Sequence, residues 1–163
     1  MVKLDIFFSE EKVSRINEFE KERYINFLLN SYKDNLEHAK FVQETYPRWT
    51  IISGYYAMHD ISKLLLAKEF NLKIEKEVHA TTIKLIENLI KNKKLFKLYE
   101  EGYNEFNSLA TDLNLAKRER AKTQYYTGSN YSKDEFKRKS KNFISHVVEP
   151  YLIKIEKLLG ELK

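Results

Sequence analysis

The chain has 163 residues, of which 42% are apolar and 33% are charged, and its formal net charge is +5. This length suits one domain with a substantial core, and the absence of cysteine excludes disulfides and thiolate metal sites. Only four glycines and two prolines are present, which disfavours a sheet protein with many tight turns.

The first third of the chain shows helical spacing of apolar residues. We expect a helix that begins with Ser9 as its N-cap and continues to about Val42, with a break or bend at residues 30–31. Pro47 separates it from the next helix, because the residue before a proline avoids the α region and proline suits the first helical turn.

The same spacing predicts four more helices, at about residues 47–70, 75–90, 95–125 and 133–162. Residues 111–112 are a candidate interruption of the fourth helix, and Pro150 is expected to kink or restart the last one. No strand-like alternation is visible, so residues 1–163 are predicted to form a single all-α bundle of about five helices. No apolar run is long enough to cross a membrane and no secretion signal is evident, so we expect a cytoplasmic protein.

The helix predicted over residues 47–70 has apolar residues on two sides. On the broader side, Gly54 lets a neighbouring helix approach closely. The second side carries three apolar residues beside a histidine, an acid and a lysine, namely Trp49, Ile52, Tyr56, His59, Asp60 and Lys63. We expect a second copy of the chain to cover this side; a ligand pocket and a solvated ion pair between Asp60 and Lys63 are the alternatives.

The positive charge is concentrated between residues 116 and 141, where nine lysines and arginines face three acids, a local charge of +6. Within this region, cations at helical spacing precede two tyrosines, in the order Lys117, Arg118, Arg120, Lys122, Tyr125 and Tyr126. Guanidinium groups grip phosphates and aromatic faces accept bases, so this pattern suits RNA or a nucleotide. A solvated, lysine-rich helix end would have the same composition. The four histidines have none of the spacings of a metal site, and neither a metal nor a cofactor is predicted.

These two clusters together resemble the HEPN domain family, in particular its uncharacterised prokaryotic branch. The resemblance rests on Tyr55-Tyr56-Ala57-Met58 with the following leucines, on His79 early in the next helix, and on the segment from Arg120 to Tyr125. It covers about residues 30–128. It implies a homodimer with the central helices near the two-fold axis, a minimal nucleotidyltransferase as partner, and a role in toxin–antitoxin or defence systems.

Active members of this family are metal-independent ribonucleases with an arginine followed, after four to six residues, by a histidine. Here Tyr125 and Tyr126 follow Arg120 at that distance, and the unperturbed pKa of tyrosine, about 10, is too high for a general base near neutral pH. The resemblance therefore implies binding rather than cleavage. Two alternatives stay open: a ribonuclease with a non-standard set drawn from Arg120, Tyr125, His59, Asp60 and His79, and a regulatory subunit modified on Tyr125 or Tyr126.

Overall fold

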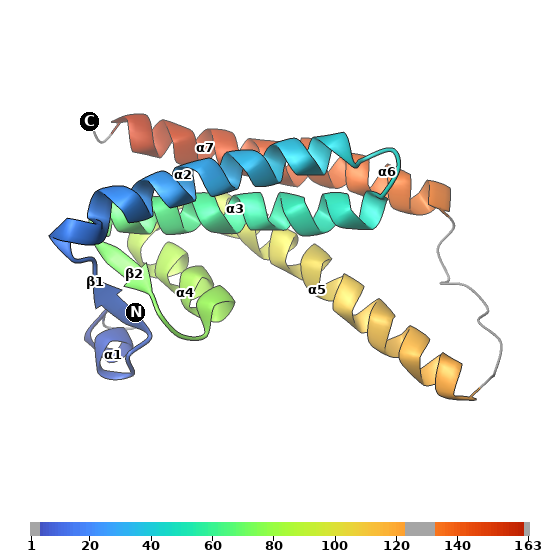
Figure 1. Ribbon diagram of the computed structural model, residues 1–163, viewed down its shortest axis with the longest axis horizontal. Coiled ribbons are helices and arrows are strands. Elements are labelled where there is room, and N and C mark those ends of the chain that lie inside the picture. Colours follow the sequence, from blue (N-terminus) through green and yellow to red (C-terminus); the bar gives the residue numbers. More distant parts are fainter. Residues whose placement is uncertain (1–3, 123–132, 162–163) are drawn as a thin grey trace.

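The structure, a computed structural model, describes residues 4–122 and 133–161, and gives the backbone alone at residues 110–122, 133 and 161. Its elements in chain order are α1 (Leu4–Ser9), β1 (Val13–Arg15), α2 (Glu18–Phe41), α3 (Pro47–Phe70), β2 (Leu72–Ile74), α4 (Val78–Ile90), α5 (Lys93–Lys122), α6 (Lys133–Phe143), the π-helical turn η1 (Ile144–Val148) and α7 (Glu149–Glu161). The fold is all-α, as predicted. Five long helical segments form it, since α6, η1 and α7 are continuous, and a small two-stranded sheet and α1 are added at one end (Figure 1). None of the described helices is both long and apolar enough to cross a membrane.

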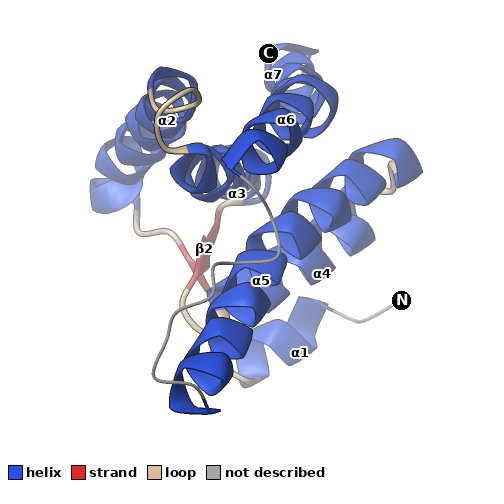
Figure 2. Ribbon diagram, turned by 90° about the vertical axis from the view of Figure 1, so that its right-hand side faces the viewer, coloured by secondary structure: helices blue, strands red, loops and turns tan. Residues whose placement is uncertain are grey.

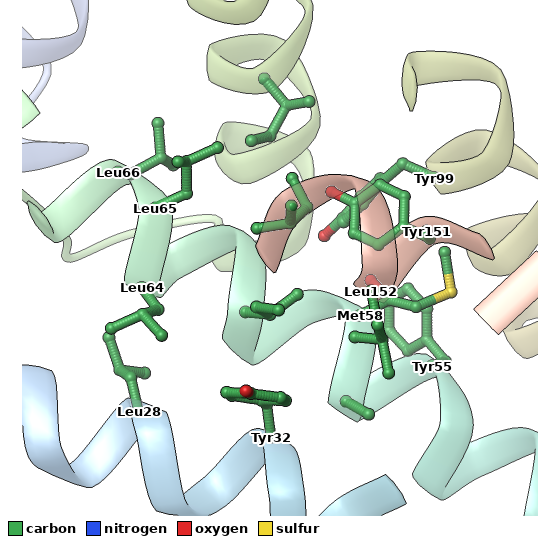
Figure 3. Packing of buried hydrophobic residues seen from close by; sticks show 14 of the residues in the cluster. Leu28, Tyr32, Tyr55, Met58, Leu64, Leu65, Leu66, Tyr99, Tyr151 and Leu152 are labelled. Atoms are coloured by element: carbon green, nitrogen blue, oxygen red, sulfur yellow. The ribbon is translucent and has the colours of Figure 1, made fainter. Parts of the chain in front are cut away.

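Helix α3 is the centre of the fold, and its predicted start at Pro47 and end at Phe70 are confirmed. It contacts α2, α4, α5, α6, η1 and α7. Its broad apolar side is fully buried, from Ile51 to Leu65, and leucines and tyrosines from the neighbouring helices pack against it (Figure 3). Asn71, in the left-handed conformation, ends the helix and donates its N–H to the carbonyl of Leu66.

The close approach expected at Gly54 is also confirmed. A Cβ atom added there would lie 3.0 Å from Ile144, 3.1 Å from Phe143 and 3.1 Å from Val148, which are the residues around η1. The wide π-helical turn ends two residues before Pro150, whose ring crowds the carbonyl four residues earlier and which has no N–H to donate to it. The expected irregularity at Pro150 therefore takes the form of a π-helical turn that packs on the glycine of α3.

The prediction of one helix from Ser9 to Val42 is wrong. Ser9 ends α1, and α2 starts at Glu18 with Asn17 as its N-cap, whose Oδ1 accepts the N–H of Phe19 at 3.0 Å. The intervening residues form β1, which pairs antiparallel with β2 in the register Val13↔Ile74. The pairing joins segments about sixty residues apart, so local spacing gives no sign of it, and the expected absence of strands is wrong for the same reason.

Three further boundaries differ from the prediction. Helix α2 continues without a break through residues 30–31, because the hydroxyl of Ser31 donates to Asp60 of α3 instead of competing for its own backbone. Helix α4 starts at Val78 rather than near Glu75, since β2 and its turn occupy the preceding residues. Helix α5 runs through residues 111–112 without interruption. The expected loop at residues 127–130 and the cap at Ser132 lie outside the described residues, although α6 does begin at Lys133.

Candidate functional site

The most polar part of the interior surrounds Asp60 of α3, which is only 7% exposed. Its Oδ2 accepts hydrogen bonds from Ser31 at 2.6 Å and from Asn35 at 3.1 Å, both on α2. Its Oδ1 lies 3.4 Å from Nζ of Lys63, one turn further along α3. The carboxylate therefore joins two helices, and the alternative of a solvated surface ion pair is excluded for Asp60.

The environment of Asp60 keeps it ionised. Burial by itself raises the pKa of a carboxyl group, but contacts from His59 and Ser31 and the charge of Lys63 outweigh it, so the pKa of Asp60 is lowered. Ser31 and Asn35 were not identified from the sequence as part of the site. Their spacing of four residues places them on one side of a helix, which is the signal that could have revealed them.

Two histidines, from α3 and α4, meet beside this carboxylate. The rings of His59 and His79 have their centroids 4.6 Å apart. His59 is 3% exposed, and its Nε2 lies 3.5 Å from the hydroxyl of Thr82. His79 is half-buried, and its Nδ1 lies 2.7 Å from the hydroxyl of Tyr55. The structure thus brings together two of the residues that the sequence proposed as acid–base candidates.

The electrostatic surroundings favour a neutral ring at His79. Burial lowers the pKa of His79, and the neighbouring His59 and Lys63 lower it further. Burial also raises the pKa of Tyr55, so its hydroxyl stays protonated and shares a hydrogen bond with Nδ1 of His79, the direction of which is set by the tautomer of the imidazole. The result is a half-buried, neutral imidazole held in place by a buried tyrosine.

Aromatic rings from α3 and α5 surround the histidine pair. Phe106 of α5 stacks on Tyr55 with a distance of 4.6 Å between ring centroids. The ring centroid of Tyr103 lies 6.3 Å from that of His79. Tyr56 meets Phe106 edge to face at 5.7 Å and is 36% exposed, so it forms the outer edge of the cluster. Tyr103 and Phe106 had no predicted role in a site, because only the packing of α5 on α3 brings them to the histidines.

The residues predicted for a dimer interface do not share one exposed surface. Trp49 is 56% exposed, Tyr56 is at the edge of the aromatic cluster and Ile52 is half-buried. His59, by contrast, is covered by the chain itself, and the side chain of Lys63 is 16% exposed. The prediction that His59 contributes to a dimer interface is wrong, because α4 folds back over this part of α3.

The basic segment lies on the last turns of α5, which extend away from the bundle (Figure 1). The helix includes the positions of Lys117, Arg118, Arg120 and Lys122, while Tyr125 and Tyr126 lie outside the described residues. The rest of the predicted basic region, on α6, is partly neutralised. Lys137 and Lys141 both pair with Glu44, and Lys139 lies 2.9 Å from Glu105.

The described residues contain no group of three His, Cys, Asp or Glu side chains that could hold a metal ion. Comparison with family models, with curated proteins and with solved structures finds no match to this chain.

Proposed function

We propose that this protein is a HEPN-like homodimer in the cytoplasm that binds RNA or a nucleotide through the cationic end of α5. The observation that carries the proposal is the concentration of four cations and one acid in residues 117–122, on a helix end that extends beyond the bundle (Figure 1). A polyanion meets little steric obstruction at such an end, and clustered cations attract it over several ångströms. The dimer contact would use the exposed part of α3 around Ile52 and Tyr56. The resemblance adds a nucleotidyltransferase partner and a toxin–antitoxin or defence setting.

The test is the salt dependence of RNA binding. We expect the affinity for a fluorescein-labelled RNA, measured by anisotropy, to fall steeply as salt rises, because bound phosphates release counterions. The double variant Arg118→Gln/Arg120→Gln should weaken binding and reduce the slope of log K against log salt by about 1.4 for a single strand. A matched control is Arg23→Gln/Lys33→Gln, which removes two exposed cations from α2. Absence of binding at low salt would remove the proposal.

A second candidate function is metal-independent RNA cleavage. It is favoured by the two neighbouring imidazoles of His59 and His79, whose ring centroids lie 4.6 Å apart. In this reaction Arg120 would hold the phosphate, and His59 or His79, from either protomer, would act as the acid or base. A neutral imidazole at His79 suits proton exchange near neutral pH. Cleavage should then persist with a chelator and be lost in His79→Ala, His59→Ala and Arg120→Ala, whereas the exposed His146→Ala control keeps it. If the three variants cleave as the native chain does, another protein is responsible.

A further inference from the structure

Three large aromatic rings are exposed where α2 turns into α3. Phe41, the last residue of α2, is 85% exposed, Tyr46 is 60% exposed and Trp49 is 56% exposed. The backbone explains part of this arrangement: Tyr46 precedes Pro47 and accepts the N–H of Trp49 at 2.9 Å, so both rings belong to the first turn of α3. A soluble surface usually exposes large apolar side chains singly, and three of them within nine residues indicate a contact surface.

Cationic side chains belong to this turn and to the neighbouring helix α6. Arg48, between Tyr46 and Trp49 in the sequence, is exposed, and its guanidinium carbon lies 4.7 Å above the ring of Phe136 on α6. This cation–π contact holds the guanidinium over Phe136 of α6, and the arginine is next to Trp49 only through the chain. Nearby, the single carboxylate of Glu44 is shared by Lys137 and Lys141, which leaves an excess of positive charge. A purely apolar partner would bury these cations without a counter-charge. An anionic partner with planar groups offers both a counter-charge and a surface on which the rings can stack.

The basic end of α5 lies on the same side of the molecule, apart from the turn. Figure 1 shows the α2–α3 turn and the start of α6 together on the right, with the last turns of α5 well below them, and Figure 2 views the molecule from that side. A flexible polyanion can therefore contact the aromatic turn and the α5 end from one side of the protein. A polynucleotide has this reach, whereas a mononucleotide does not.

We propose that Phe41, Tyr46 and Trp49 form a stacking platform for the bases of an unpaired RNA strand, whose phosphates lie beside Arg48 and continue toward the basic end of α5. The proposal rests on the proposed RNA binding and adds a second contact and the strandedness of the ligand. Base faces are available for stacking only where the strand is unpaired, since a duplex covers them. The platform also assigns Trp49 to the nucleic acid rather than to the dimer contact expected from the sequence.

Trp49 is the only tryptophan of the chain, so its emission reports on the platform directly. We expect oligouridylate to quench the emission of Trp49 at low salt. An RNA duplex of matched length should leave the emission unchanged. Oligothymidylate, which has the deoxy sugar, should also quench it if base stacking alone makes the contact. Equal quenching by the duplex would overturn the platform. So would an emission that changes with protein concentration and not with RNA, because a second copy would then cover Trp49.

Variants provide the second readout. Trp49→Ala and Tyr46→Ala should each weaken binding of labelled oligouridylate by about tenfold, the usual effect of removing one stacking ring. The matched control is Phe19→Ala, which removes a 98% exposed ring from the start of α2 and should bind as the native chain does. Circular dichroism confirms that each variant is folded.

The two proposals fail in different ways. If labelled RNA binds in a salt-dependent manner while the emission of Trp49 and the affinity of Trp49→Ala stay unchanged, the platform is wrong and RNA binding through α5 stands. If no RNA binds to the native chain at low salt, the proposed function itself is wrong and the platform with it.

Discussion

The two sides of α3 are both buried but are held by different forces. On the side of η1 and α7, the backbone at Gly54 receives three apolar side chains, and the hydroxyl groups of Ser62 and Tyr151 share a hydrogen bond of 2.6 Å. On the side of α2 and α4, an ionised carboxylate at Asp60 and two histidines are buried beside the apolar side chains. The first side depends on shape and the second on charge and protonation, so only the second can respond to pH.

The largest effect should come from breaking the fit on the first side. Gly54→Val places carbon atoms where Ile144, Phe143 and Val148 already lie within 3.1 Å of a single Cβ, and overpacking of this kind costs about 2–3 kcal/mol. Urea denaturation followed by circular dichroism measures the loss. Gly160→Ala is the control, because nothing lies within 4 Å of its added Cβ, and it should be neutral or slightly stabilising. Equal stabilities for Gly54→Val and the native chain would contradict the close packing of η1.

A smaller effect is expected on the charged side. Asp60→Ala removes the acceptor of Ser31 and Asn35 and the partner of Lys63, which should lower the free energy of unfolding by about 2 kcal/mol. Glu44→Ala, which removes an exposed carboxylate that also pairs with two lysines, should cost much less, because water and salt screen an exposed ion pair. If both variants lose the same free energy of unfolding, burial of the carboxylate does not determine its contribution to stability.

The smallest effect should be a pH dependence confined to this side. The pKa of His79 is lowered from 6.5 in the folded chain, so the unfolded chain binds a proton more readily. Its contribution to stability is therefore complete above about pH 6.5 and is lost as the pH falls through the folded-state pKa. The lowered pKa of Asp60 adds a second loss that begins only below its ordinary value of 3.8. His79→Gln should flatten the unfolding free energy between pH 6.5 and more acidic values; a profile as steep as the native one would refute the assignment.

What the sequence determined by itself is local. The limits of α3 follow from Pro47 and from continuous apolar spacing up to Phe70, and the role of Gly54 follows from its position on the apolar side. Both features depend only on residues within a few turns of one helix, where helical geometry fixes which residues share a side. The all-α class follows from the same spacing over most of the chain.

Tertiary structure decided what depends on distant partners. The strand at Val13 exists because Ile74 pairs with it, and Asp60 is buried because α2 supplies its hydrogen-bond donors. His59 and His79 are twenty residues apart and become neighbours only when α4 folds back on α3. Helical spacing fixes the direction of a side chain relative to its own helix, but the elements that meet it are fixed only by the packing of the whole chain.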